Sequence, residues 1–291
     1  MPNAITVESV FDPVTGTVGY VVADRKARRA AVIDPVLDYD PKASRTSTAT
    51  AEKLAALIGD CALDWVIETH AHADHLSAAP WFKRRFGAKI ATGTRVGKVQ
   101  ATWAGILNLG PDFPVDGRQF DRLLAEGDTI DIGAAKLTVW STPGHTPSCT
   151  MLVLETGAGP AQIFLGDTMF MPDLGTARCD FPGGDARTLY RSIRRVLALP
   201  GDTILHVCHD YPPETRGPLV STTVAEQRAG NIHVRDGVDE DSFVKMRETR
   251  DKTLAAPVLL LPSIQVNIRA GELPPAEANG TRYLKIPLDA I

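Results

Sequence analysis

The sequence predicts a mixed α/β protein, and three features of its 291 residues support this class. Short apolar runs bounded by turn residues are typical of buried strands, and they recur along most of the chain. Stretches with apolar residues three and four positions apart alternate with these runs, as expected of amphipathic helices. The composition, 44% hydrophobic and 23% charged, is typical of a globular protein that can bury a large core.

The first third of the chain is expected to begin with strands and continue with two helices. The apolar runs that predict strands are Gly19–Ala23, Ala30–Ile33 and Trp65–Thr69. A polar surface loop is expected at Asp38–Thr50. One face of the first helix is formed by Ala51, Leu54, Ala55 and Ile58. The second helix is expected to have Ser77 as its N-cap, Pro80 in its first turn and Gly87 at its end.

The rest of the chain continues this alternation. Its predicted strands are Lys136–Ser141, Thr150–Leu154, Gln162–Leu165 and Thr203–Val207. Amphipathic helices are predicted at Thr188–Leu199 and Asp241–Leu254, and Val258–Ile268 is expected to be an apolar connection or a strand. No long linker divides the sequence, so residues 1–291 are expected to form a single domain with a short C-terminal extension from about residue 236.

Charge and composition argue against several classes of protein. The net charge of −4 lacks the basic footprint that non-specific nucleic-acid binding needs. The sequence has no apolar run of about 18 residues, so no membrane span is expected. The 4 cysteines are far apart, with no CxxC pair, and residues 1–16 have neither a basic nor an apolar targeting region. These features predict a protein of the reducing cytoplasm, with buried free cysteines.

The strongest chemical signal is the string His70-Ala71-His72-Ala73-Asp74-His75. Only 7 histidines occur in the chain, and this short motif contains several of them beside a carboxylate. His70 and His72 follow a predicted strand, and Asp74 and His75 begin the turn before a helix. Neutral imidazoles and carboxylates are ligands for zinc, iron or manganese.

Further candidate ligands follow other predicted strands, and they are His145, Asp167 and His209. Loops anchored by a rigid sheet commonly carry binding residues. Each of these residues alone is more often structural, but together with the histidine motif they favour a metal site. His206 and His233 lack such a context and are assigned to packing or to the surface.

This set of residues, in this order, resembles the metallo-β-lactamase superfamily. The resemblance implies an αββα sandwich, in which two sheets pack face to face and helices lie outside. Finer motifs resemble the persulfide dioxygenases, also called sulfur dioxygenases, and their bacterial β-lactamase hydrolase-like branch. These motifs are LGDTMF at 165–170, GTARCDF at 175–181, CHDY at 208–211 and VNIRAG at 266–271.

The resemblance also implies a site and an activity. One Fe(II) ion per chain would be held by His70, His145 and Asp167, a two-histidine, one-carboxylate triad that leaves open positions. His72, Asp74, His75 and His209 would surround the ion or form a vacant second site. The implied reaction is oxidation of glutathione persulfide by O2 and water to sulfite and glutathione. A homo-oligomer is a further expectation.

The carboxylates of glutathione require cationic or polar anchors. Arg178 and Tyr211 match family residues near the active site and are the first candidates, as catalytic or substrate-binding groups. Arg250 and Lys252, on the predicted late helix, are weaker candidates, since charged residues there also suit a solvated face. The sequence departs from the family at Cys179, where a hydroxyl residue is usual, and in the long segment Val96–Gln119, which suits a lid or a subunit contact.

Other functions fit parts of the pattern. A two-metal thiolester hydrolase similar to glyoxalase II would use all the ligands, with Asp167 bridging two ions. A non-catalytic protein that responds to sulfide or metal is a second alternative, although a complete ligand set argues against it. β-Lactam hydrolysis is a third, since fold alone does not fix function.

Overall fold

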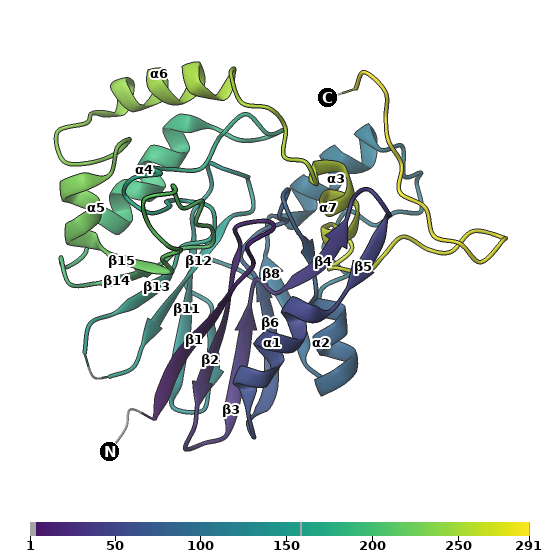
Figure 1. Ribbon diagram of the computed structural model, residues 1–291, viewed down its shortest axis with the longest axis horizontal. Coiled ribbons are helices and arrows are strands. Elements are labelled where there is room, and N and C mark those ends of the chain that lie inside the picture. The colour runs from purple at the N-terminus through teal and green to yellow at the C-terminus, as the bar shows by residue number, and fades with distance from the viewer. Residues whose placement is uncertain (1–3, 158, 291) are drawn as a thin grey trace.

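The computed structural model describes residues 4–157 and 159–290, in which two six-stranded sheets pack together (Figure 1). In spatial order the first sheet contains β1 (Ile5–Phe11), β2 (Val18–Asp24), β3 (Arg29–Ile33), β6 (Ala62–Glu68), β8 (Lys89–Gly93) and β9 (Arg122–Leu124). The second contains β10 (Thr129–Ile132), β11 (Ala135–Ser141), β12 (Thr150–Glu155), β13 (Gln162–Phe164), β14 (Ile204–His206) and β15 (Ser221–Thr223).

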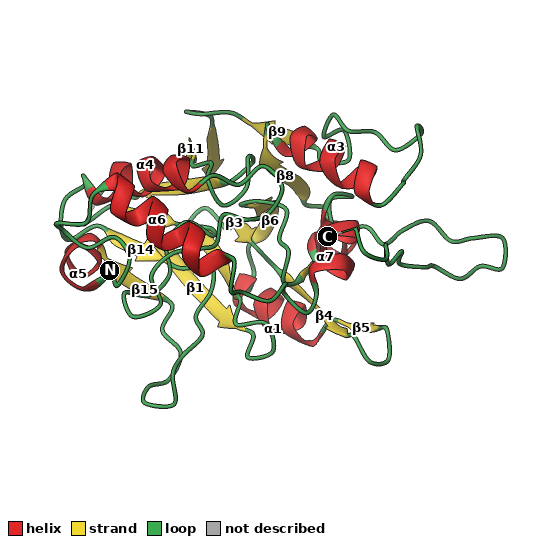
Figure 2. Cartoon of the chain, turned by 90° about the horizontal axis from the view of Figure 1, so that it is seen from above, coloured by secondary structure: helices red, strands yellow, loops and turns green. Residues whose placement is uncertain are grey.

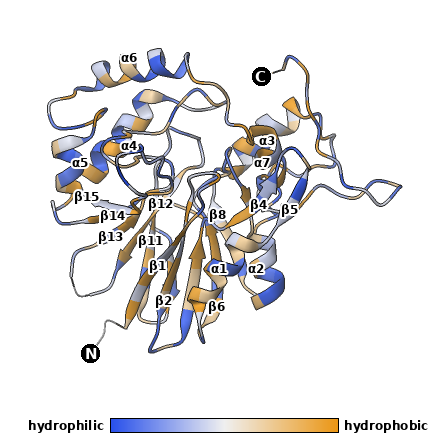
Figure 3. Ribbon diagram, in the orientation of Figure 1, coloured by the Kyte–Doolittle hydropathy of each residue, from blue (hydrophilic) through white to orange (hydrophobic). Residues whose placement is uncertain are grey.

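The inner faces of the two sheets share one apolar core. Tyr20 and Ile33 from the first sheet belong to the same buried cluster as Leu137 and Phe164 from the second. Because neighbouring side chains on a strand point to opposite faces, the adjacent residues point outward, toward the helices. Strand β2 is therefore buried along its whole length. In Figure 3 the strands of both sheets are mainly hydrophobic.

Helices cover both outer faces. Helices α1 (Ala49–Ile58) and α2 (Ala79–Phe86) pack on the first sheet through Leu54 and Phe82, in a cluster with Val21. On the second sheet, Leu189 of α4 (Ala186–Leu197) and Phe243 of α6 (Glu240–Asp251) belong to one cluster with its strand residues. Helix α6 runs beside α4 (Figures 1 and 2), and α5 (Val224–Gly230) also contacts α4. The predicted αββα sandwich is confirmed.

A third, smaller sheet and two helices complete the described fold. The small sheet has the order β5 (Arg45–Ser47), β4 (Val36–Asp40), β7 (Leu76–Ser77). Helix α3 (Val96–Ile106) packs against α7 (Leu260–Asn267), so Trp103 is buried and Phe113 packs on the same cluster. Among the described residues, no helix combines the length and the apolar character that crossing a membrane requires.

Several sequence predictions require correction. The polar stretch Asp38–Thr50 is not a loop throughout: it pairs as the β4–β5 hairpin and then begins α1. Val258–Ile268 contains helix α7, because its apolar residues form a helical face that packs on α3 and on Ala71 and Ala73 of the loop after β6. The local sequence pattern does not show these contacts. Ser77 lies in β7, where its hydroxyl donates to Glu68 and accepts the backbone N–H of Ala79 at 3.0 Å, but the N-cap of α2 is Ala78. Helix α4 begins before Thr188, because Asp185 caps it.

Candidate metal centre

The candidate ligands converge at one edge of the sandwich, where strands of both sheets end. The loop after β6 carries His70, His72, Asp74 and His75. From the second sheet come His145 after β11, Asp167 after β13 and His209 after β14. All of these side chains are buried except Asp74, which is partly exposed. Rigid strands therefore hold the loops that bring these residues together.

A first ligand set consists of His70, His145 and Asp167. The Nε2 atoms of His70 and His145 lie 3.9 and 3.7 Å from Oδ2 of Asp167. Ligand atoms about 2.1 Å from a shared ion can lie at most about 4.2 Å apart, so this spacing fits one ion between them. His70 Nε2 is buried without a hydrogen-bond partner among the described residues, as expected of an atom that faces a metal.

The hydrogen bonds of His70 select its metal-binding tautomer. Thr69 donates its hydroxyl proton to Asp34 Oδ2 at 2.8 Å, so its oxygen accepts from Nδ1–H of His70 at 3.1 Å. Nε2 then keeps its lone pair for a metal. Burial and the neighbouring imidazoles lower the pKa of His70 well below its usual value, which favours the neutral, ligating form.

His145 is oriented in the same way by a backbone carbonyl. Its Nδ1–H donates to the carbonyl oxygen of Arg178 at 2.7 Å. A carbonyl can only accept, so the proton is on Nδ1 and Nε2 is free to bind a metal. Both histidines of the first set are thus prepared to bind through Nε2.

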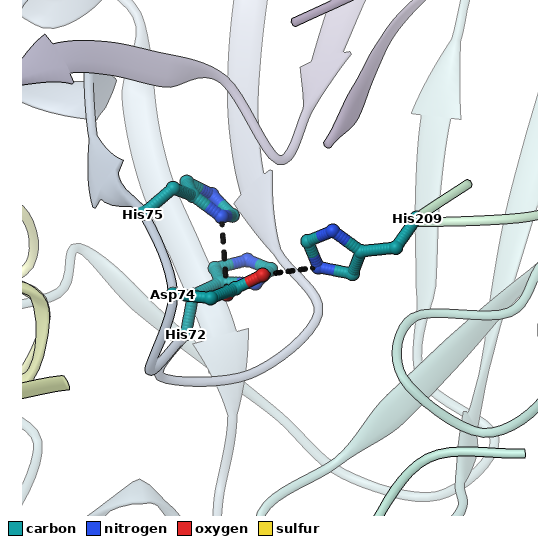
Figure 4. Close-up of side chains that lie close together, drawn as sticks. All are labelled: His72, Asp74, His75 and His209. Atoms are coloured by element: carbon teal, nitrogen blue, oxygen red, sulfur yellow. Dashed lines mark ion pairs between the residues drawn. The ribbon is translucent and has the colours of Figure 1, made fainter. Parts of the chain in front are cut away.

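A second group consists of His72, Asp74, His75 and His209 (Figure 4), each with a potential ligand atom close to those of the others. Asp74 lies between two imidazoles, with Oδ2 3.0 Å from His209 Nε2 and Oδ1 3.5 Å from His75 Nδ1. Burial opposes ionisation of Asp74, but His209 and His75 outweigh it and lower its pKa. Asp167 lies between the two sets, since its Oδ1 is 3.3 Å from His209 Nε2.

Behind this group, Asp34 and Glu68 enclose His72. Nε2 of His72 lies 2.9 Å from Asp34 Oδ1 and 3.3 Å from Glu68 Oε2. Burial opposes protonation of His72, but both carboxylates outweigh it and raise its pKa well above its usual value. Asp34 also accepts the backbone N–H of Thr69 at 2.8 Å, so it fixes the start of the metal-binding loop.

The sequence analysis did not identify Asp34, Glu68 or Asn267. Asp34 directly follows β3, and its position after a predicted strand was a signal that could have found it. Asn267 of α7 donates to the carbonyls of His72 and His75, each at 2.8 Å. Nothing local signals that contact, because about 190 residues separate the partners.

A cavity of about 610 Å³ opens beside the first ligand set. His145 and Asp167 line it, and its walls are largely apolar, with Phe170, Phe181 and Leu254 among them. Such a pocket, with few polar groups converging on it, is typical of a small-molecule site.

Three arginines line this cavity, and two of them are already paired. Arg178 forms a two-point ion pair with Asp180, with both contacts at 2.6 Å. Arg247 is buried against Asp251. The guanidinium of Arg250 makes no hydrogen bond or ion pair to any residue that the structure describes.

The other predicted substrate contacts occupy different places. Tyr211 lines the cavity, is 48% exposed, and its hydroxyl lies 3.5 Å from Asp74 Oδ2. Lys252 does not line it; it borders a separate hollow with Glu248 and Cys179. The four cysteines are free and buried, and His206 and His233 are buried. His206 packs on Phe164.

The sequence matches the model of a known protein family. Residues 12–209 match the family model described as the metallo-beta-lactamase superfamily. The chain belongs to this superfamily. It is an enzyme of the metallo-hydrolase superfamily, with a metal-binding site of histidine and aspartate residues.

Individual relatives of this superfamily member carry different names. It is 49% identical to Glyoxylase B2 of Dictyostelium discoideum, over 99% of both chains. It is 48% identical to a beta-lactamase hydrolase-like protein of Xylella fastidiosa, covering 98% of this chain and 65% of that protein. It is 30% identical to the human mitochondrial persulfide dioxygenase ETHE1, over 92% of this chain and 89% of that protein.

Among solved structures, the crystal structure of ETHE1 from Myxococcus xanthus is similar to this superfamily member. The two share 27% identity with a TM-score of 0.70, covering 92% of this chain and 100% of the other. The predicted resemblance to persulfide dioxygenases and β-lactamase hydrolase-like proteins is therefore confirmed.

Proposed function

We propose that this chain is a non-haem Fe(II) dioxygenase that converts glutathione persulfide, O2 and water to glutathione and sulfite. The observation that carries the proposal is the first ligand set, in which two imidazole Nε2 atoms lie 3.9 and 3.7 Å from one carboxylate oxygen, a spacing that one ion can bridge. Two histidines and one carboxylate are the donor set of non-haem Fe(II) oxygenases. The similarity to proteins named persulfide dioxygenase supports the same assignment.

The proposed chemistry divides between the ion and the chain. Fe(II), held by His70, His145 and Asp167, would supply the activation of O2. The balanced reaction is GSSH + O2 + H2O → GSH + SO3²⁻ + 2 H⁺, so both oxygen atoms of O2 pass to the terminal sulfur. The protein contributes orientation and a cavity with largely apolar walls beside the ligand set.

The unpaired arginine suggests how the substrate is held. Arg250 is the cavity-lining arginine with no carboxylate partner among the described residues, so its guanidinium is free to bind a substrate carboxylate. Arg178, although nearer to His145 through its carbonyl, has its guanidinium occupied by Asp180. The hydroxyl of Tyr211 is a further polar contact at the cavity. Arg250 thus becomes the first candidate anchor, ahead of Arg178.

A direct experiment tests the proposal. Protein prepared without air and loaded with Fe(II) is mixed with glutathione persulfide, and O2 uptake and sulfite are measured together. We expect one O2 to be consumed for each sulfite formed, with iron near one ion per chain. Absence of both O2 uptake and sulfite would contradict the proposal.

A second candidate function is a two-metal thiolester hydrolase similar to glyoxalase II. It is favoured by one observation: Asp167 lies between the first ligand set and His209, as a bridging carboxylate would. The 49% identity to a protein named Glyoxylase B2 agrees with it. Hydrolysis of S-lactoylglutathione without O2 uptake, by protein that holds two metal ions, would support this alternative. A cytoplasmic location, a single domain and a homo-oligomer remain predictions.

A further inference from the structure

A short segment beside the metal centre, residues 175–179, holds one of the metal ligands in place; we call it the strap. The carbonyl oxygen of Arg178 in the strap accepts the Nδ1–H of His145 at 2.7 Å. This hydrogen bond fixes the orientation of the imidazole ring. The position of the strap therefore determines where Nε2 of His145 points.

Helix α6 holds the strap through two buried side chains. Arg247 donates from Nη1 to the carbonyl of Thr176 at 3.1 Å, and Asp251 accepts the backbone N–H of Cys179 at 2.9 Å. The two side chains also bind each other, with Nε and Nη2 of Arg247 2.8 and 2.6 Å from Oδ1 of Asp251. Arg247 is 1% exposed and Asp251 4% exposed, so water does not compete for these contacts.

The opposite side of the strap is fixed as well. His233 accepts the backbone N–H of Thr176 at 3.0 Å, and Asn231 donates to the carbonyl of Gly175 at 3.1 Å. Gly175 has a φ of +86°, and a Cβ there would lie 2.1 Å from His233 Nδ1. The strap is thus bound between the 231–233 segment and α6, and it has little freedom to shift alone.

We infer that Arg247 and Asp251 are positioning residues for the metal ligand His145. They act through the strap: α6 fixes the backbone of Thr176 and Cys179, and this backbone presents the Arg178 carbonyl to the imidazole. Both residues lie outside the part of the chain, 12–209, that matches the superfamily model. The inference rests on the proposed metal centre, but not on the reaction assigned to it.

A gain in folding stability does not by itself explain why the Arg247–Asp251 ion pair is buried. Replacing a buried ion pair by apolar residues of similar size is often neutral or stabilising, because the two charges must be removed from water. A pair that spans the backbone of the strap instead fixes geometry, since each partner also holds one of its peptide groups. The fixed strap in turn orients the imidazole of His145 through the Arg178 carbonyl.

The test uses Co(II) as the probe, added to the metal-free protein. In the Arg247→Met variant we expect Co(II) to bind about 10-fold more weakly, the lower end of the effect of changing groups behind a ligand. We also expect its visible absorption spectrum to change, because the His145 ligand is less well oriented. Arg247→Lys, which keeps the charge, should restore part of the affinity. Arg228→Met removes a half-exposed ion pair with Asp236 and serves as the matched control with wild-type Co(II) binding.

The outcomes separate the inference from the proposed function. If Arg247→Met lowers the melting temperature but leaves both Co(II) affinity and the spectrum unchanged, the pair is only structural and the inference is wrong. If wild-type protein binds no Co(II), the proposed metal centre is wrong, and the inference is wrong with it. Loss of dioxygenase activity is not used as a readout.

Hydrogen exchange of the wild-type protein gives a test that does not depend on a variant folding. If α6 holds the strap, the amide of Cys179 is protected in the metal-free protein as strongly as in the Co(II)-loaded protein. The Thr176 amide, bonded to His233, should behave in the same way. Protection of the Cys179 amide that develops only after Co(II) is added would overturn the inference.

Discussion

The two ligand sets at the metal centre differ in how many of their charged and polar groups already have a partner within the protein. In the first set, His70 and His145 each donate a hydrogen bond from Nδ1–H to a protein acceptor, and their Nε2 atoms lie on the side of Asp167. In the second set, Asp74 lies between His209 and His75, and His72 is enclosed by Asp34 and Glu68.

This difference shows which set depends more on a metal ion. The second set compensates part of its charge within itself, because Asp74 lies close to His209 and His75, although Nε2 of both histidines is buried without a hydrogen-bond partner among the described residues. In the first set, the Nε2 atoms of His70 and His145 lie 3.9 and 3.7 Å from Oδ2 of Asp167, too far for hydrogen bonds within the set. An ion between those atoms would supply the missing interaction, so we expect the first set to bind metal more tightly.

The largest expected effect comes from removing a ligand of the first set. His70→Ala should weaken Fe(II) binding by more than about 100-fold, because loss of a ligand exceeds the 10–100-fold cost of changing groups behind it. His209→Ala is the matched variant from the second set and should keep nearly all of its iron. Metal analysis after gel filtration measures both. Equal loss of iron from the two variants would indicate a two-metal centre instead.

Removing the charge of Asp34 should have the next largest effect. Asp34→Asn takes away one partner of the buried His72 pair, so we expect the free energy of unfolding of the metal-free protein to fall by about 3 kcal/mol. Asparagine tolerates the left-handed backbone found at Asp34, so the turn itself should persist. Urea unfolding at pH 7 measures the change.

Glu68→Gln is the comparison for Asp34→Asn. Glu68 lies farther from His72 and makes fewer hydrogen bonds, so we expect a loss of about 1 kcal/mol. A larger loss for Glu68→Gln than for Asp34→Asn would contradict the assignment of Asp34 as the main partner.

The two sets should also respond differently to pH. The raised pKa of His72 keeps it protonated in the metal-free protein near neutral pH, so an ion bound through His72 must displace a proton. The affinity for that ion should rise about 10-fold per pH unit until pH exceeds the raised pKa.

The lowered pKa of His70 means that it is already neutral at pH 7, so it releases no proton when an ion binds. Titration with Zn(II) at pH 7 and pH 8, with proton release followed calorimetrically in two buffers, separates the two steps. We expect protons to be released in the weaker binding step, which fills the second set. Proton release in the tighter step instead would indicate that the second set binds metal more tightly than the first.

The smallest expected effect concerns the cavity rather than the metal. Arg250→Ala should raise KM for glutathione persulfide about fivefold with little change in kcat, as expected when an exposed ion pair worth about 1 kcal/mol is lost. Lys252→Ala, at the C-cap of the same helix but outside the cavity, should leave KM unchanged. Steady-state O2 uptake measures both, and a KM effect from Lys252 alone would place the substrate elsewhere.

Local patterns in the sequence were sufficient for the central strands of the two large sheets and for α1, α2, α4 and α6, but not for the outer strands, α3 or α5. The strand at Lys136–Ser141 and the helices α4 and α6 were predicted within a few residues, because apolar periodicity reports directly which face is buried. The β4–β5 hairpin and α7 were missed. The pairing of β4 with β5 is local, but its polar residues resemble those of a loop. The burial of β4 and α7 depends on partners farther along the chain, such as Leu76 and the loop after β6.

The sequence by itself determined the types of ligand and their placement after strands, since the histidine motif and the strand ends are local features. Only the tertiary structure decided which ligands share an ion, which arginine is free, and which tautomer each histidine adopts. Those properties are set by contacts such as Thr69–His70, Arg178–His145 and Asn267–His72. The physical reason is that hydrogen bonds and burial act over a few ångströms in space, whatever the separation of the residues along the chain.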